Sequence, residues 1–177
     1  VASGGGVAGD VIASIVVGAA TDAGGYDFDE SRSSLAGSVF EDTSNDGVQD
    51  GTEVGIEGVT VTLSGTDDLG NSVSLSTTSG PDGSYSFTGL LSGSYTVTES
   101  QPVSHADGLD TAGSVGGDTS TNDVISAVAL PGGTAATGYT FGELVPSSLA
   151  GSVVGDAGTG IANTTVTLSG TDDLGNP

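Results

Sequence analysis

Short runs in which apolar and polar residues alternate recur through the middle of the chain, and each run predicts a β-strand. Val59, Val61 and Leu63 alternate with threonines, and Val73 and Leu75 alternate with serines. Because successive side chains of a strand point to opposite faces of its sheet, this alternation predicts strands with one face in a core. The further predicted strands lie at residues 35–41, 85–87, 95–97, 124–130 and 139–141.

The segments between these runs predict tight turns rather than helices. Residues 81–83 (Pro-Asp-Gly) have the composition of a turn, and the Asp-Asp pair at 67–68 precedes Leu-Gly-Asn, which is typical of a hairpin turn. Residues 100–122 are rich in Gly and Asp and are expected to form a long loop. About seven strands without a helix signal predict an all-β fold, an antiparallel sandwich of two sheets.

Three segments of the chain recur further along it. Two of them return after 113 and 114 positions and the third after only 105, so a deletion of nine residues separates the last copy from the others. A period of about 113 residues exceeds that of a solenoid and predicts a tandem array of domains. The recurring pairs are residues 10–12 with 123–125, 33–39 with 147–153, and 62–71 with 167–176.

This period divides the chain into three parts. Residues 33–143 form one complete repeat, which is large enough to bury its own core. Residues 1–30 correspond to the C-terminal part of a preceding repeat, and residues 147–177 to the N-terminal part of a following one. Within the first part, residues 11–20 are apolar but shorter than the ~20 residues of a membrane-spanning helix, and a buried strand is expected there. We expect the end parts to be completed by a longer polypeptide or by identical chains, in the latter case as a head-to-tail filament.

Oxygen-bearing residues between 42 and 53 have the spacing of a twelve-residue calcium loop. Asp42 lies at loop position 1, Gly47 at position 6, where the backbone turns sharply, and Glu53 at position 12, where a bidentate carboxylate binds the ion. The alternative interpretation is an acidic, solvated loop. The last repeat has lost this loop through its deletion. The predicted Ca²⁺ ligands are Asp42, Ser44, Asp46, the carbonyl of Val48, Asp50 and Glu53.

Charge and composition favour an extracellular setting. One Arg, no Lys and 23 acidic residues give a net charge of −22. Nucleic acid and anionic membrane surfaces should therefore repel the chain, whereas divalent cations should gather around it. Neither nucleic-acid binding nor membrane insertion is expected. The chain has no Cys, so disulfides cannot reinforce its fold.

The chain carries these motifs in order: residues 39–42 (Val-Phe-Glu-Asp), the acidic loop residues, and residues 55–63, 82–87 and 93–97. Together they resemble the B-type domain of the serine-aspartate-repeat adhesins. This SdrD B-like family is related to the collagen-adhesin B-type modules. The resemblance implies a prealbumin-like β-sandwich that acts as a calcium-stabilised spacer in a large bacterial surface or secreted protein. Some related modules carry a Lys–Asn isopeptide bond, which is impossible here because the chain has no Lys.

The Gly and Asp-rich segment and its surroundings hold further candidate ligands. Asp107, Asp110, Asp118 and Asp123 are interpreted either as a second, weaker calcium site or as a solvated acidic loop. His105 is the only histidine. No nucleophile–base pair accompanies it in the sequence, so it is expected to be an exposed loop residue.

The expected function is structural rather than enzymatic. We expect a calcium-stabilised repeat of a large bacterial extracellular adhesin, stalk or filament, whose partners are calcium and neighbouring repeats or identical chains. At low calcium, such an array should first become flexible at the linker 29–34, which we expect to lie near the calcium loop. The alternative is a surface module that binds carbohydrate or protein through exposed aromatic residues. The Tyr-x-Phe motifs at 26–28 and 139–141 are candidates for such a stripe, although strand alternation favours a place in the core.

Overall fold

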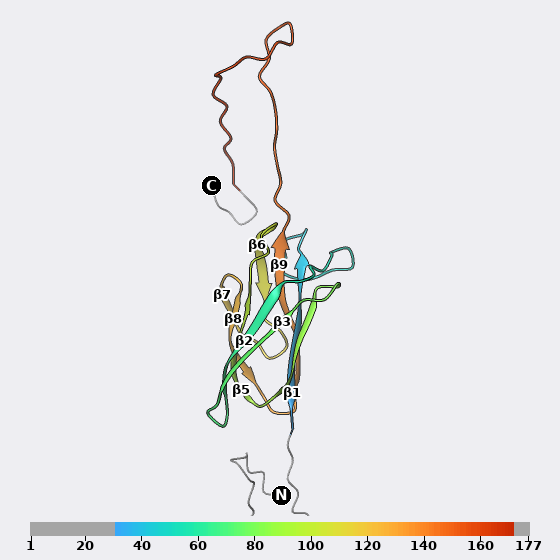
Figure 1. The fold of residues 1–177 in the computed structure, drawn as a ribbon, viewed down its shortest axis with the longest axis vertical. Helices are drawn as coiled ribbons and strands as arrows, with labels where there is room; N and C mark the ends of the chain where they lie inside the picture. The colour runs from blue at the N-terminus through green and yellow to red at the C-terminus, as the bar shows by residue number, and fades with distance from the viewer. Residues whose placement is uncertain (1–30, 172–177) are drawn as a thin grey trace, which may run out of the picture.

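The computed structural model describes residues 31–171, in which nine strands form a sandwich (Figure 1). Expectations that concern residues 1–30, including the strand at 11–20, and residues 172–177 lie outside the described part. None of the described residues forms a helix that could cross a membrane. The strands are β1 (Ser33–Glu41), β2 (Thr60–Asp67), β3 (Ser72–Thr78), β4 (Ser84–Leu90), β5 (Gly93–Glu99), β6 (Ala106–Thr111), β7 (Asp118–Thr121), β8 (Val124–Leu130) and β9 (Ala135–Leu144).

These strands form two sheets, which confirms the predicted all-β sandwich. One sheet has the order β4-β1-β9-β6 and the other the order β3-β2-β5-β8-β7. The prediction of antiparallel pairing is wrong for β1 and β9, which pair in parallel from Ser34 beside Ala135 to Glu41 beside Glu143. Because these two strands run in the same direction, the domain begins at one end of the sandwich with β1 and finishes at the other with β9 (Figure 1).

Alternating side chains from both sheets fill the core. Val61 and Leu63 on β2 are fully buried, as are Tyr139 and Phe141 on β9. The latter pair therefore belongs to the core and not to an exposed recognition stripe, while the related motif at 26–28 lies outside the described residues. Burying each large apolar side chain contributes about 1.5–3 kcal/mol relative to exposure. Further fully buried core residues are Leu35, Val39, Val97, Ile125, Val128 and Ala136.

Strand β3 is more exposed than its alternating pattern predicts. Leu75 is 42% exposed, because β3 lies at the edge of its sheet with β2 as its neighbour there. The turn between β2 and β3 forms as predicted. Its Asp67 carboxylate accepts hydrogen bonds from the backbone N–H groups of Leu69 at 3.0 Å and Asn71 at 2.8 Å.

The segment predicted as one long loop contains strands β6 and β7. Strand β6 pairs with β9 and places Asp107 beside Glu143. Its partly buried positions include carboxylates, so the hydrophobic alternation that marks a strand is missing there. The exposed position expected for His105, just before β6, is also wrong. Its side chain is only 12% exposed, and its Nε2 lies 3.3 Å from Oε1 of Glu41.

Candidate metal centre

Two carboxylates organise the predicted calcium loop from its ends. Asp42 follows β1 directly and is fully buried. Its Oδ2 accepts the backbone N–H of Gly47 at 2.7 Å, and its Oδ1 accepts that of Asp46 at 3.2 Å. Glu53, 9% exposed, accepts the backbone N–H of Ser44 at 3.2 Å through Oε1 and that of Asp50 at 3.1 Å through Oε2. The first and last predicted ligands therefore both face the interior of the loop.

The other predicted ligands of this loop are exposed. The Asp46 carboxylate accepts the backbone N–H of Val48 at 2.9 Å, and the Asp50 carboxylate accepts that of Thr52 at 2.8 Å. Those Thr52 contacts lower the pKa of Asp50. The Ser44 hydroxyl donates to Oδ1 of Asp42 at 3.3 Å. All six predicted ligands thus lie in one hydrogen-bonded loop, and calcium binding by this loop stays a prediction.

The loop contacts strands β6 and β9. Gly47 adopts a left-handed conformation, with φ of 74°, and its carbonyl accepts the hydroxyls of Thr111 at 2.8 Å and Thr140 at 3.1 Å. Asp42 N–H donates to the Glu143 carbonyl at 2.9 Å. The expectation that the loop lies near the linker 29–34 is wrong. It lies at the opposite end of β1, because it follows the last residue of that strand.

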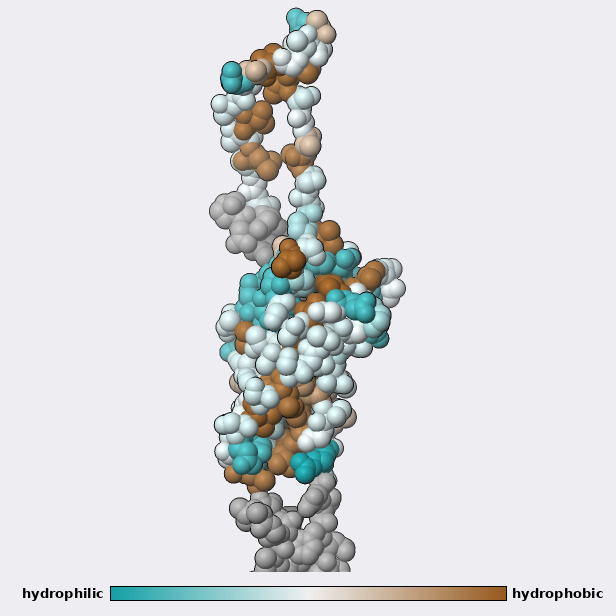
Figure 2. Space-filling model, in the orientation of Figure 1, coloured by the Kyte–Doolittle hydropathy of each residue, from teal (hydrophilic) through white to brown (hydrophobic). Residues whose placement is uncertain are grey.

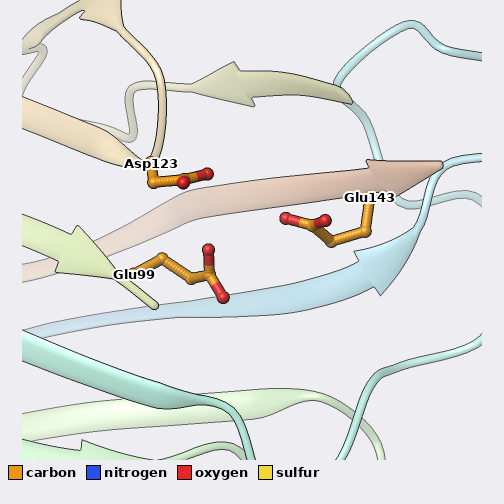
Figure 3. A group of neighbouring side chains, drawn as sticks. All are labelled: Glu99, Asp123 and Glu143. Atoms are coloured by element: carbon orange, nitrogen blue, oxygen red, sulfur yellow. The ribbon is translucent and has the colours of Figure 1, made fainter. Parts of the chain in front are cut away.

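A second group of carboxylates converges beside this loop, and we call it the acidic cluster. Figure 3 shows that Glu99 at the end of β5, Asp123 before β8 and Glu143 on β9 point toward one another. One carboxylate oxygen from each of the three residues lies within 4.8 Å of those from the other two. Asp107 and Asp110 on β6 form a second such group with the same Asp123. Five carboxylates from four parts of the chain thus share one site.

Several oxygens of the acidic cluster have no hydrogen-bond donor. Glu99 is 3% exposed and Glu143 only 1% exposed. Both carboxylate oxygens of Glu99 and one from each other cluster member are buried without a partner. Burying a polar atom without a partner costs about 1–3 kcal/mol, and more for a charge. A cation bound by these oxygens would therefore offset this cost.

Burial and mutual repulsion raise the pKa values of four cluster members. Burial raises the pKa of Glu99 to about 9, with further contributions from the charges of Glu143 and Asp123. The pKa of Glu143 rises to about 8, mainly through burial. Burial and neighbouring carboxylates likewise raise the pKa of Asp110 to about 7 and that of Asp107 to about 6. Ionising the whole cluster at neutral pH thus requires compensating positive charge.

No side chain among residues 31–171 supplies this charge. Arg32 precedes β1, roughly 30 Å of strand away from Glu41 and Glu143 at its far end. His105 contacts Glu41, which lies outside the cluster. The Gln101 amide donates to Glu143, but it is neutral. The charge of the cluster is therefore compensated either by bound protons or by an external cation.

The cluster only partly matches the second site considered from sequence. Asp107, Asp110 and Asp123 do converge. Asp118 does not, because it lies on the exposed strand β7 and accepts the backbone N–H of Ser120 at 2.9 Å. Sequence reasoning missed Glu99 and Glu143. Glu99 is the last residue of β5, and Glu143 is the last but one of β9. Each follows apolar residues on the inner face of its strand, and a carboxylate at such a position was the available signal of a buried site.

The donor set suits a hard divalent cation. The cluster and the loop offer oxygen ligands only, and Ca²⁺ takes six to eight oxygens in flexible geometry. Mg²⁺ demands a stricter octahedron, and zinc prefers nitrogen and sulfur ligands. The residues present, with their unpartnered buried oxygens, therefore fit calcium.

Known proteins resemble the folded part of this chain. The SdrD B-like domain model matches residues 33–142. Serine-aspartate repeat-containing protein F of Staphylococcus epidermidis is 50% identical over 64 residues, which are 36% of this chain and 4% of that protein. Serine-aspartate repeat-containing protein D of Staphylococcus aureus strain Newman is 40% identical over 100 residues, 51% of this chain and 7% of that protein. The chain therefore spans less than a tenth of either relative's length.

Solved structures show a more distant likeness. The major plantain pollen allergen Pla l 1 aligns with a TM-score of 0.40 at 15% identity, over 66% of this chain and 98% of the allergen. The shaft pilin SpaA of Lactobacillus rhamnosus GG aligns with a TM-score of 0.36 at 12% identity, over 66% of this chain and 52% of the pilin. At these scores the structural likeness adds nothing to the assignment. The match over residues 33–142 covers more than half of the chain, and the protein accordingly belongs to the SdrD B-like domain family.

Proposed function

We propose that this protein is a structural repeat of a large bacterial surface protein, and that bound calcium stabilises its sandwich. The acidic cluster carries the proposal, because it gathers five carboxylates with unpartnered buried oxygens where no protein cation reaches them. The family supports the structural role. The calcium loop at 42–53 supports the same cation independently, through its ligand spacing.

The cluster offers two neighbouring positions for a cation. Glu99, Asp123 and Glu143 define one group, and Asp107 and Asp110 define the other together with the same Asp123. A carboxylate has two oxygens, so Asp123 can contribute to both. The predicted loop is a third position, and its Asp42 is hydrogen-bonded to the backbone of Glu143. We therefore expect the sites to influence one another.

Calcium would act by stabilising the folded domain. In extracellular modules, calcium sites typically have dissociation constants of about 0.1–1 mM. A free concentration 100-fold above such a constant stabilises the folded state by about 2.7 kcal/mol per site. Small domains have total stabilities of only about 5–15 kcal/mol, so one site is a considerable share. Such weak sites are filled where calcium is millimolar, and we further propose an extracellular location at the bacterial surface.

No observation favours the alternative of a ligand-binding module. Every Tyr and Phe among the described residues is buried, from Phe40 to Phe141. An exposed aromatic platform of the kind that recognises sugars is therefore missing from residues 31–171. We accordingly propose a spacer that holds other parts of a longer protein in place, and not an enzyme or a binding head.

Calorimetry of Glu99→Gln tests the cluster. Folding of the parent near neutral pH requires Glu99 to take up a proton that the unfolded chain has released, whereas the amide needs none, so this variant should melt at a higher temperature than the parent in chelator. It should also gain less from millimolar calcium. Asp118→Asn is the matched control, since it removes an exposed charge outside the cluster, and it should keep the parental calcium response. An unchanged calcium response in Glu99→Gln would refute calcium binding by the group of Glu99, Asp123 and Glu143.

A second pair of variants tests the loop separately. Glu53→Gln should lower the number of calcium ions bound in titration calorimetry or weaken one binding step. Glu57→Gln removes an exposed charge four positions later and should bind as the parent does. If Glu53→Gln binds calcium like the parent, the loop is only a hydrogen-bonded turn, and the cluster alone binds calcium.

A further inference from the structure

Strand β3 ends the five-stranded sheet, and β2 is its only neighbour in the sheet among the described strands. The outer side of an edge strand presents unpaired backbone N–H and C=O groups, which can pair with a further strand. Leu75 lies opposite Leu63 on the inner face of β3, yet it is 42% exposed because the sheet ends there. This edge therefore offers both backbone groups and an apolar side chain to a further strand.

The other three edges of the two sheets carry features that hinder strand pairing, and β3 carries none of them. Edge strands are commonly protected by charged residues, irregular register or short length. Strand β6 holds Asp107 and Asp110, and β7 is only four residues long and begins with Asp118. Strand β4 pairs with β1 through an irregular register. By contrast, β3 pairs with β2 over seven consecutive positions without irregularity, and Ser72–Thr78 includes no charged residue.

Charge restricts where a second copy of the same chain can approach. The net charge of −22 makes two copies repel each other. Figure 2 shows strongly hydrophilic side chains toward both ends of the sandwich, with a pale zone of intermediate hydropathy between them. The residues of β3 are serines, threonines, one valine and one leucine. An approach along β3 therefore brings two backbones together without placing a carboxylate of the strand itself in the contact.

Hydrogen bonds at the two ends of the β2–β3 pair fix which backbone groups of β3 face the open side. The N–H of Asp67 donates to the Asn71 carbonyl at 3.0 Å, and that of Ser79 donates to the Val59 carbonyl at 2.9 Å. Bonded and unbonded residues alternate along an antiparallel pair, so the odd-numbered residues between Asn71 and Ser79 bond β2. The backbone groups that point away from β2 belong to Ser72, Ser74, Ser76 and Thr78.

We propose that two copies of this domain pair through β3, antiparallel to each other about a two-fold axis at Leu75. Ser72 of one copy then faces Thr78 of the other, and Ser74 faces Ser76. All four residues that direct backbone groups outward thus form hydrogen-bonded pairs. A shift by one residue would place them opposite residues whose backbone groups point to β2, and these bonds would be lost. The contact uses the same surface on both copies, so it closes at a dimer.

The same register gives the exposed Leu75 an apolar partner. The two Leu75 residues face each other as a pair without direct backbone bonds, the kind of pair in which side chains lie closest. Each covers apolar surface that the other exposes in the single domain. On the outer face, the hydroxyls of Ser74 and Ser76 meet across the contact, and such pairs stabilise a sheet. None of these residues belongs to the acidic cluster or the calcium loop, so the contact goes beyond the proposed function and does not depend on calcium.

A proline at Ser74 tests the contact. The Ser74 N–H points away from β2, so Ser74→Pro removes a hydrogen bond to the second copy and none to β2. Ser86→Pro on β4 is the matched control. The Val39 N–H bonds the Gly83 carbonyl, so the same alternation turns the Ser86 N–H away from β1.

Sedimentation equilibrium measures the effect of both prolines. The parent and Ser86→Pro should approach twice the monomer mass as the protein concentration rises. Ser74→Pro should keep the monomer mass over the same range. Both variants should melt near the parental temperature, because each proline lies on an edge strand with its ring nitrogen toward solvent.

Engineered disulfides test the register at two exposed positions, Ser72 and Thr78. These residues face each other as a hydrogen-bonded pair, whose Cα atoms are typically ~5.5 Å apart, within the range of a disulfide. The chain has no Cys, so every disulfide is an engineered one. Mixing Ser72→Cys chains with Thr78→Cys chains under mild oxidation should give a covalent heterodimer. Ser72→Cys chains alone should cross-link only at the level of random collisions, because the two copies of residue 72 lie roughly 20 Å apart along the strands.

Three outcomes would overturn the proposal. One is a parent that stays monomeric at the highest concentration at which it is soluble. Another is a Ser74→Pro variant that dimerises as the parent does, since the contact would then lie elsewhere. The third is a heterodimer yield from Ser72→Cys and Thr78→Cys no higher than the homodimer yield of either chain alone. Adding Ser74→Pro to both cysteine variants should lower the heterodimer yield to that homodimer level.

Discussion

The backbone N–H of Asp42 donates a hydrogen bond of 2.9 Å to the carbonyl of Glu143. The side chain of Asp42 organises the predicted calcium loop, and that of Glu143 points into the acidic cluster. One contact therefore joins both candidate sites to the last residues of β9. The chain continues from there toward residues 147–171, so cations bound at either site would stiffen the point where the chain leaves the sandwich.

Calcium should protect one end of the sandwich from hydrogen exchange. We expect slower exchange in the loop at 42–53, in β6 and in the end of β9, because these segments hold the candidate ligands. The turn between β8 and β9, at the far end, should exchange at the same rate with and without calcium and is the internal control. Peptide-resolved mass spectrometry measures both, and uniform protection along β9 would contradict a local effect.

Without calcium, the domain should lose stability as the pH rises. The pKa values of Glu99 and Glu143 are raised to about 9 and about 8, so their folded forms hold protons that the unfolded chain has released. Their contribution is complete below about pH 4.5 and is lost as the pH rises through 8 to 9. Melting in chelator should therefore occur several degrees lower at pH 9 than at pH 6.

Saturating calcium should reduce this pH dependence, because the ion replaces the protons as the compensating charge. Glu99→Gln should reduce it in chelator as well, since one titrating group is gone. Equal pH profiles in chelator for the parent and this variant would show that Glu99 does not titrate as its burial implies.

Alanine substitutions at two glycines should distinguish the stability cost of a strained backbone from that of a steric clash. Gly47 and Gly58 both have left-handed backbones, with φ of 74° and 81°. Alanine at Gly58 meets no atom within 4 Å and should cost only the strain, about 1–2 kcal/mol. At Gly47 an added Cβ lies 2.7 Å from the Thr111 hydroxyl, so Gly47→Ala should cost more. Chemical denaturation measures both, and equal losses would mean that the loop moves freely away from β6.

The buried hydroxyl of Tyr85 should stabilise the sheet, because it links β4 to β9, which are separated by β1. The Tyr85 hydroxyl donates to the Tyr139 carbonyl at 2.8 Å, beside Gly37, where a side chain would collide with that same carbonyl. Tyr85→Phe should cost about 1–3 kcal/mol in chemical denaturation, because the buried carbonyl loses a donor. Tyr95→Phe is the control. Its hydroxyl bonds the Leu91 carbonyl at 2.9 Å, only four residues away and partly exposed, so its loss should cost less.

The sequence alone determined the elements whose signals are local. Alternation at Val61 and Leu63 marks a half-buried strand because side-chain direction follows from backbone geometry. The turn residues around Asp67 act within a few positions of themselves, and the spacing from Asp42 to Glu53 is a property of one loop. These features were predictable, as was the family, whose motifs are contiguous in the chain.

Only the tertiary structure decided which distant residues meet. The parallel pairing of β1 with β9 depends on the path of the whole chain, and no periodicity encodes it. The same holds for the acidic cluster. Glu99 and Glu143 are 44 positions apart and belong to different sheets. Their burial, their unpartnered oxygens and their raised pKa values arise from the packing of β5, β6, β8 and β9 at one end of the sandwich. Strand β6 escaped prediction for the same reason, because no local sequence pattern indicates that Asp107 and Asp110 converge with Asp123 in the folded domain.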